Sequence, residues 1–124
     1  MARVVHFEIP SAKSADSRKF YETVFGWKFT QWGGGDTEYW LITPGPADEP
    51  GIDGGLGGAA DNLQGTVNTV EVSNLDASLK QVEDNGGQVI MPKSEIPGVG
   101  WLAYIREPGG TVFGMIQNLP NRVM

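Results

Sequence analysis

The residues of this chain best suited to chemistry are a histidine and two glutamates at matched spacing. His6, the only histidine, lies two residues before Glu8, so both side chains point to the same side of an extended strand. Glu71 lies two residues after Thr69 in a later segment of similar pattern. If these strand faces line one cleft, the two carboxylates face it together. Buried like charges raise each other's pKa, which favours a cationic or hydrogen-bond-donating ligand.

Each of these residues also has a simpler interpretation. His6 could make a hydrogen bond inside a cleft, or act as a metal ligand or general base. The glutamates could both face solvent at sheet edges, in which case the charge contributes only to solubility. The sequence alone leaves these alternatives open.

Aromatic residues follow the same pattern of pairs. Trp40 and Trp101 occupy matching places in two similar segments, and Tyr104 follows Trp101 by three residues. Tryptophan and tyrosine combine a flat apolar ring with a polar group, as small-molecule pockets often require. We therefore predict that Trp40, Trp101 and Tyr104 line a ligand site, the alternative being ordinary core packing.

The candidates match because the chain is one pattern written twice, with Asp16 and Gly26 recurring as Asp76 and Gly86. Alternating or apolar segments predict strands, helical spacing and capping residues predict helices, and glycine-rich segments predict turns. The first copy has predicted strands at 3–9, 27–32, 38–43 and 52–56, a helix from the polar segment 11–16 to Gly26, and a hairpin loop at 33–36. The second has strands at 67–72, 88–91, 100–106 and 111–117, and a helix that a capping box at 73–76 begins. The order βαβββ thus occurs twice, which predicts an α+β fold.

Length and composition restrict the class of protein. The chain has 124 residues, which suits a single domain over 1–124, with units at about 3–57 and 66–118 and a linker at about 57–65. A net charge of −6 without a basic stripe argues against nucleic-acid binding. No apolar run is long enough to cross a bilayer, and no signal peptide is recognisable. Together with the absence of cysteine, these features lead us to expect a cytoplasmic protein.

The chain resembles the vicinal oxygen chelate superfamily, which includes glyoxalases, bleomycin-resistance proteins and extradiol dioxygenases. The resemblance covers about residues 3–117 and rests on short motifs: His6-Phe7-Glu8-Ile9-Pro10, Phe20-Tyr21-Glu22, Val24-Phe25-Gly26-Trp27, Tyr39-Trp40-Leu41-Ile42, Ile96-Pro97-Gly98-Val99-Gly100-Trp101 and Glu107-Pro108-Gly109-Gly110. It implies two tandem βαβββ units forming a mixed β-sheet cup, with helices packed outside and a cleft between the units.

The same resemblance implies a divalent metal held by histidines on the first strand of each unit and glutamates on the last. In this sequence His6 alone matches, while Gly54, Thr69 and Gly114 occupy the other three places. A catalytic divalent site normally needs about three protein ligands. We therefore predict no metal cofactor. The alternative is a divalent metal held unconventionally by His6, Glu8 and Glu71.

The predicted function is small-molecule binding in the cleft, as in the bleomycin-resistance branch, with a degenerate metal site. The ligand-binding candidates are His6, Glu8, Trp40, Thr69, Glu71, Trp101 and Tyr104. The alternative is a metal-dependent glyoxalase, lyase or dioxygenase-type enzyme, so the sequence leaves open whether a reaction is catalysed; a module without a ligand fits the polar and aromatic candidates less well. The predicted partners are a small molecule, cationic in the sharper interpretation, and a second copy in a homodimer; neither nucleic acid nor membrane is expected.

Overall fold

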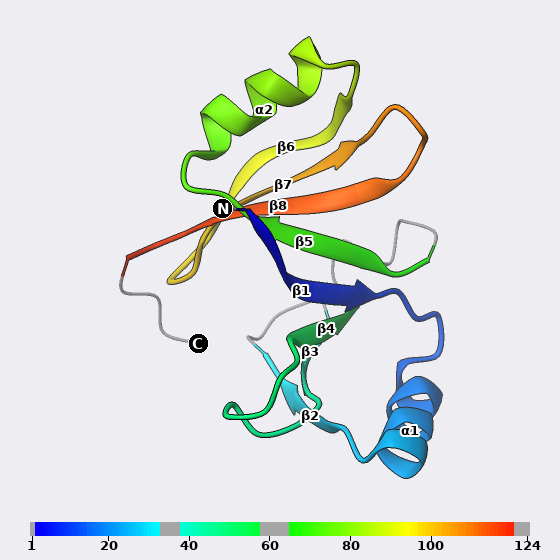
Figure 1. Ribbon diagram of the computed structural model, residues 1–124. Helices are drawn as coiled ribbons and strands as arrows, with labels where there is room; N and C mark the ends of the chain where they lie inside the picture. The colour runs from blue at the N-terminus through cyan, green and yellow to red at the C-terminus, as the bar shows by residue number, and fades with distance from the viewer. Residues whose placement is uncertain (1, 33–37, 58–64, 121–124) are drawn as a thin grey trace. The chain divides into compact units, whose positions relative to one another are not determined.

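The computed structural model describes residues 2–32, 38–57 and 65–120 (Figure 1). The chain divides into two compact units, His6–Val67 and Asn68–Met124 with Met1–Val5. The predicted hairpin loop at 33–36 and most of the predicted linker at 57–65 lie outside the described residues. No helix of the described part is long and apolar enough to cross a membrane.

The first repeat contains β1 (Arg3–Ile9), α1 (Ser14–Phe25), β2 (Lys28–Gln31), β3 (Tyr39–Thr43) and β4 (Asp53–Gly57). Its strands are ordered β2-β3-β4-β1, with β1 parallel to β4 and the other pairs antiparallel. The helix ends at Gly26, whose φ of 73° is a left-handed conformation that glycine adopts without a Cβ penalty.

The second repeat contains β5 (Val67–Glu71), α2 (Leu75–Asp84), β6 (Gln88–Ile96), β7 (Gly100–Arg106) and β8 (Val112–Asn118). Its strands are ordered β5-β8-β7-β6, and β5 is parallel to β8 as β1 is to β4. The predicted α+β class is confirmed, with the order βαβββ present twice and a mixed sheet in each repeat. The single-domain boundaries stay a prediction.

The second repeat has a closed apolar core beneath its helix. Leu75 is fully buried at the start of α2 and packs with Ala103, Ile105 and Met115 from β7 and β8. Leu79 and Val82, one and two turns further along α2, pack against the same cluster. The helical spacing seen in the sequence therefore reports the side of α2 that meets the sheet.

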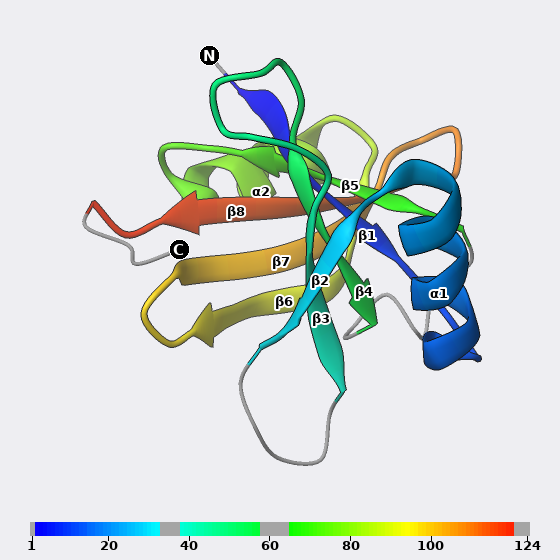
Figure 2. The same cartoon turned by 90° about the horizontal axis from the view of Figure 1, so that it is seen from below.

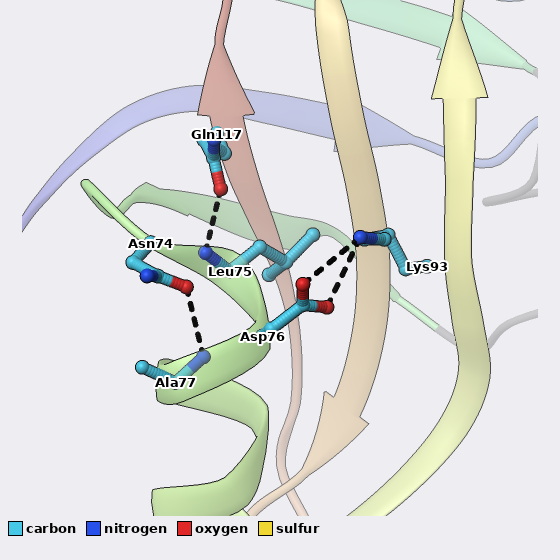
Figure 3. A network of polar contacts seen from close by, with 6 residues as sticks. All are labelled: Asn74, Leu75, Asp76, Ala77, Lys93 and Gln117. Atoms are coloured by element: carbon cyan, nitrogen blue, oxygen red, sulfur yellow. Dashed lines mark hydrogen bonds and ion pairs between the residues drawn. The ribbon is translucent and has the colours of Figure 1, made fainter.

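Polar contacts fix the start of α2 (Figure 3). The backbone N–H of Leu75 donates to Oε1 of Gln117 on β8 at 2.8 Å, and Nζ of Lys93 on β6 lies 3.1 Å from Asp76. The N-cap is Asn74, whose side chain accepts from the N–H of Ala77. The predicted capping box, which began at Ser73, was therefore one residue early; Asn is as good a cap as Ser because its side-chain oxygen reaches the same orphan donors.

The first repeat buries Ile42 and Leu56 of its strands, 0% and 1% exposed, on the side of Phe7 and Trp40, but it buries no residue of its helix. No residue of α1 is buried, although the helix carries Phe20, Tyr21, Val24 and Phe25. In Figure 2, α1 lies alongside the strands of its own unit. Its inner contacts are aromatic: Tyr21 stacks on Trp27 with ring centroids 5.2 Å apart, and Trp27 lies 5.8 Å from Phe7 of β1.

Candidate functional site

Strand register places His6, Glu8 and Tyr39 on one face of the first repeat. In β1 and β4, His6 lies opposite Asp53 and Glu8 opposite Gly55, while in β3 Tyr39 lies opposite Gly57. Residues that pair across strands point to the same side of a sheet, and neighbours along a strand point to opposite sides. The other side belongs to α1, because Phe7 of β1 meets Trp27 and Trp40 of β3 meets Arg18. We call the side without α1 the polar face, defined by His6, Glu8, Tyr39 and Asp53.

The centre of the polar face is a hydrogen bond between His6 and Tyr39. The imidazole Nε2 lies 3.0 Å from the Tyr39 hydroxyl, and both side chains are half-buried. Glu8 is 5% exposed, which is rare for a carboxylate. Burial first, and then the negative charge of Glu8, raises the pKa of Tyr39 above its ordinary value of 10.0. The phenol therefore stays protonated at neutral pH and keeps a proton to donate.

Gly55 makes the space that Tyr39 occupies. A Cβ at this position of β4 would overlap the Tyr39 hydroxyl and ring. Any side chain larger than hydrogen would therefore push Tyr39 away from His6. Sequence reasoning noted Tyr39 only as an aromatic neighbour of Trp40 and missed Gly55 altogether. The signal was available in the Gly54-Gly55 pair inside a strand, since glycine in a strand often marks a close approach.

The structure does not bring the two tryptophans to the polar side of their strands. Trp40 lies opposite Leu56 and therefore on the α1 side, where the Arg18 guanidinium lies 3.9 Å from the ring centroid. Trp101 packs against the core under α2, and Nζ of Lys93 lies 5.0 Å from its ring. Core packing, the alternative considered for these rings, describes the position of Trp101.

In the second repeat, register places Thr69, Glu71 and Tyr104 on one face. Thr69 and Tyr104 both lie opposite Gly114, and Glu71 lies opposite Ile116. Thr69 is 1% exposed, and its hydroxyl has no hydrogen-bond partner among the described residues. Glu71 is exposed and accepts a hydrogen bond from Nδ2 of Asn118. These three predicted residues thus share a side, as His6 and Glu8 do, whereas a common cleft for Glu8 and Glu71 stays a prediction.

The register also corrects one predicted metal position. Thr69 lies opposite Gly114, and its counterpart His6 lies opposite Asp53, so the match of Gly114 in the first repeat is Asp53. The assignment to Gly54 was wrong by one residue; Gly54 lies opposite Phe7, whose ring a Cβ there would meet at 2.5 Å. His6 and the exposed Asp53 therefore occupy both ligand places of the first repeat.

This set of donors does not fit the divalent site that the resemblance implies. The second repeat offers a threonine hydroxyl at Thr69 and no side chain at Gly114, where a Cβ would lie 2.7 Å from Thr69 Oγ1. No group of three or more histidine, cysteine, aspartate or glutamate side chains within residues 2–32, 38–57 and 65–120 is arranged to hold a metal ion. Two strong ligands are fewer than a catalytic divalent site normally has.

The polar face can recognise a ligand with its own side chains. Glu8 offers acceptor oxygens, Tyr39 offers a donor that does not ionise near neutral pH, and His6 holds the Tyr39 hydroxyl through Nε2. Side chains that are already held by hydrogen bonds, as His6 and Tyr39 are, lose little conformational entropy when a ligand binds.

Comparison with known proteins agrees with this fold. Residues 3–33 match the family model described as bleomycin resistance protein-like N-terminal. A protein of Mycobacterium tuberculosis (strain CDC 1551 / Oshkosh), named "Putative glyoxylase CFP32", is 28% identical over 113 residues, which are 89% of this chain and 43% of that protein. The chain therefore spans less than half the length of the curated relatives it matches.

Solved structures give the same result at lower identity. Methylmalonyl-CoA epimerase from Mycobacterium tuberculosis has a TM-score of 0.67 at 15% identity, over 94% of this chain and 88% of that one. A glyoxalase/bleomycin resistance protein/dioxygenase superfamily member from Vibrio splendidus 12B01 has a TM-score of 0.67 at 18% identity, over 96% and 100%. A variant methylmalonyl-CoA epimerase from Streptomyces coelicolor, in complex with 2-nitronate-propionyl-CoA, has a TM-score of 0.70 at 12% identity, over 98% of each chain. The resemblance inferred from the sequence is confirmed at the level of the fold.

Proposed function

We propose that this chain, which has the vicinal oxygen chelate fold, binds a small organic molecule at the polar face of its first repeat. The observation that carries the proposal is the buried Glu8 carboxylate, 5% exposed, beside a Tyr39 phenol that is hydrogen-bonded to His6 at 3.0 Å. Burying a charge is costly unless the charge is paired or hydrogen-bonded, so a buried carboxylate is an uncommon feature of a sheet face. A few convergent polar groups of this kind are typical of small-molecule sites.

The preferred ligand is cationic or rich in hydrogen-bond donors. Glu8 presents a negative charge on the polar face, Asp53 adds a second at its exposed end, and the whole chain carries −6. A charge-assisted hydrogen bond to a desolvated carboxylate contributes roughly 1.5–3 kcal/mol. An anionic ligand would instead meet repulsion from the same groups.

The family match supports binding over catalysis. The segment that matches the bleomycin resistance protein-like model, residues 3–33, contains His6 and Glu8. The Streptomyces coelicolor neighbour holds a CoA ester, which is an anion, at only 12% identity to this chain. The acidic polar face argues for a different ligand here.

A thermal-shift panel of organic amines, acyl-CoA thioesters and neutral compounds tests the proposal. Amines should dominate the hits, and Glu8→Gln should weaken the best amine by about tenfold or more, equivalent to at least about 1.4 kcal/mol. Glu22→Gln on exposed α1 is the matched control and should leave the affinity unchanged. Hits confined to acyl-CoA thioesters, or equal affinity in Glu8→Gln, would contradict the proposed ligand class.

A second candidate is a metal-dependent enzyme of the same superfamily, which the His6–Asp53 pairing favours. It requires further ligands beyond this pair. Elemental analysis of protein purified without chelator separates the two candidates: we expect far less than one metal per chain. A stoichiometric metal that His6→Ala and Asp53→Asn both remove would favour the enzyme.

The proposal includes a homodimer in the cytoplasm, as the sequence predicts. Neither feature bears on the ligand test.

A further inference from the structure

We propose that Ser14, Arg18 and Trp40 form a binding site for a small carboxylate on the α1 side of the first repeat. This site lies on the opposite side of the sheet from the polar face, and it takes a ligand of the opposite charge. The inference therefore goes beyond the ligand site proposed above and does not rest on it.

The Arg18 side chain connects the three members of the site. Its guanidinium carbon lies 3.9 Å from the centroid of the Trp40 ring, and its Nε donates to Oγ of Ser14 at 3.3 Å. All three side chains are half-buried. The two terminal nitrogens of the guanidinium keep their N–H donors for a ligand, and the Ser14 hydroxyl, as the acceptor of this bond, keeps its own proton to donate.

The indole N–H of Trp40 is a donor without an acceptor. Its nitrogen, Nε1, is buried and has no hydrogen-bond partner among residues 2–32, 38–57 and 65–120. Buried donors in native proteins are nearly always paired, because leaving one without an acceptor costs its full desolvation. Since the Arg18 guanidinium lies over the same ring, one anion with two oxygens can accept from the guanidinium and from the indole N–H together.

The charge of Arg18 is also uncompensated within the described part of the chain. The ion pairs found there are Lys80–Asp84 and Lys93–Asp76, and neither includes Arg18. A guanidinium, a hydroxyl and an indole all donate hydrogen bonds, and the guanidinium is positive. The ligand that satisfies this set is therefore an acceptor with negative charge, which is an oxyanion.

The second repeat shows which group the first repeat lacks (Figure 3). There Nζ of Lys93 lies 5.0 Å from the ring of Trp101, the counterpart of Trp40, and the same ammonium lies 3.1 Å from the Asp76 carboxylate. The cation comes from a strand in the second repeat and from a helix in the first, but in both it covers the matched indole. The counterpart of Asp76 is Asp16, which forms no ion pair among the described residues. An external carboxylate would supply to the first repeat what Asp76 supplies to the second.

A carboxylate suits Arg18 better than other anions of its size. The planar guanidinium donates two parallel N–H bonds to the two oxygens of a carboxylate, a geometry that a lysine ammonium does not match. The acids of the polar face, Glu8 and Asp53, point to the other side of the sheet. Salt at physiological strength screens exposed charges beyond about 8 Å, so we expect the net charge of −6 to weaken this site without preventing binding.

A nuclear magnetic resonance titration with sodium acetate at constant ionic strength tests the site. The indole N–H of Trp40 and the Nε–H of Arg18 should move together with one saturable dissociation constant, while the indole signal of Trp101 stays in place. Arg18→Gln should weaken acetate by about tenfold or more. Lys19→Gln is the matched control, because it removes the same charge from the next, exposed residue of α1 and should leave the dissociation constant unchanged.

A second variant separates ligand binding from simple packing of Arg18 on Trp40. Trp40→Phe keeps an aromatic ring under the guanidinium and removes only the indole donor, so it should weaken acetate, as read at Arg18, with an unchanged circular dichroism spectrum. Acetate affinity equal to wild type in this variant or in Arg18→Gln, no saturable response of either signal, or tighter binding of inorganic phosphate than of acetate would overturn the proposal. The titration needs no side chain of the polar face, so the proposed amine site and this carboxylate site can each fail while the other stands.

Discussion

The two repeats have the same order of elements but differ in how far they bury their helices and their glutamates. In the second repeat α2 closes a core around Leu75, which is fully buried, whereas no residue of α1 is buried in the first. The burial of the matched glutamates differs in the opposite direction. Glu8 of the first repeat is 5% exposed and lies beside a His6–Tyr39 hydrogen bond, while its counterpart in the second repeat, Glu71, is exposed. One topology can thus bury its helix in one copy and its glutamate in the other, because the fold needs only the βαβββ pairing in common.

The largest expected effect is a loss of stability on truncating the buried residue of α2. Leu75→Ala removes a fully buried side chain and should lower the free energy of unfolding by about 2–5 kcal/mol. Val24→Ala on α1 removes a side chain that is 55% exposed and should change it by less than about 1 kcal/mol in dilute solution. Urea denaturation measures both. Equal losses would remove the contrast between the helices.

A smaller effect is expected at the glycine beneath Tyr39. Gly55→Ala should cost about 1–3 kcal/mol by overpacking and should displace Tyr39 from His6. Gly45→Ala is the control, since a Cβ there meets only Glu49 Oε2 at 3.5 Å, an ordinary contact. The nuclear magnetic resonance signals of the single histidine report the displacement directly. An unchanged His6 environment in Gly55→Ala would show that Gly55 does not position the pair.

The smallest effect appears only in alkaline solution. The pKa of Tyr39 is raised on folding, so the folded state holds this proton more tightly than the unfolded state. The stabilising contribution is complete below pH 10 and is lost as pH rises above it, by at most about 1.4 kcal/mol per pH unit. Tyr39→Phe should remove this slope from denaturation curves above pH 10. Glu8→Gln should reduce it, because the charge of Glu8 is the second cause of the shift.

Much of the fold was predictable because strand and helix signals are local. The predicted strands at 3–9 and 100–106 coincide with β1 and β7, and Gly26 ends α1 as expected. The strand predicted at 88–91 extends to Ile96 as β6, because bulges let the strand continue past Pro92. A periodic pattern cannot report such a continuation.

The site was harder to predict because it depends on register between strands. Repeat alignment correctly matched Trp40 with Trp101, but it could not show that both rings face the helices, since parity with His6 requires the pairing of β3, β4 and β1. A shift of one residue reverses the side of a strand. The same uncertainty in register led the sequence alignment to assign Gly54 to the metal-ligand position of β4, where the structure has Asp53. The shared side of His6 and Glu8 was predictable, because residues two apart on one strand point to the same side whatever the strand pairs with.

The cations above the two tryptophans have an optical consequence. Arg18 lies over Trp40 and Lys93 over Trp101, each on the helix side of its own repeat. Trp101 is the only tryptophan after residue 40, so its indole emission belongs to the second repeat alone. A fluorescence change that persists when the three tryptophans of the first repeat are replaced by phenylalanine would therefore report on the surroundings of Trp101 and on the second repeat alone.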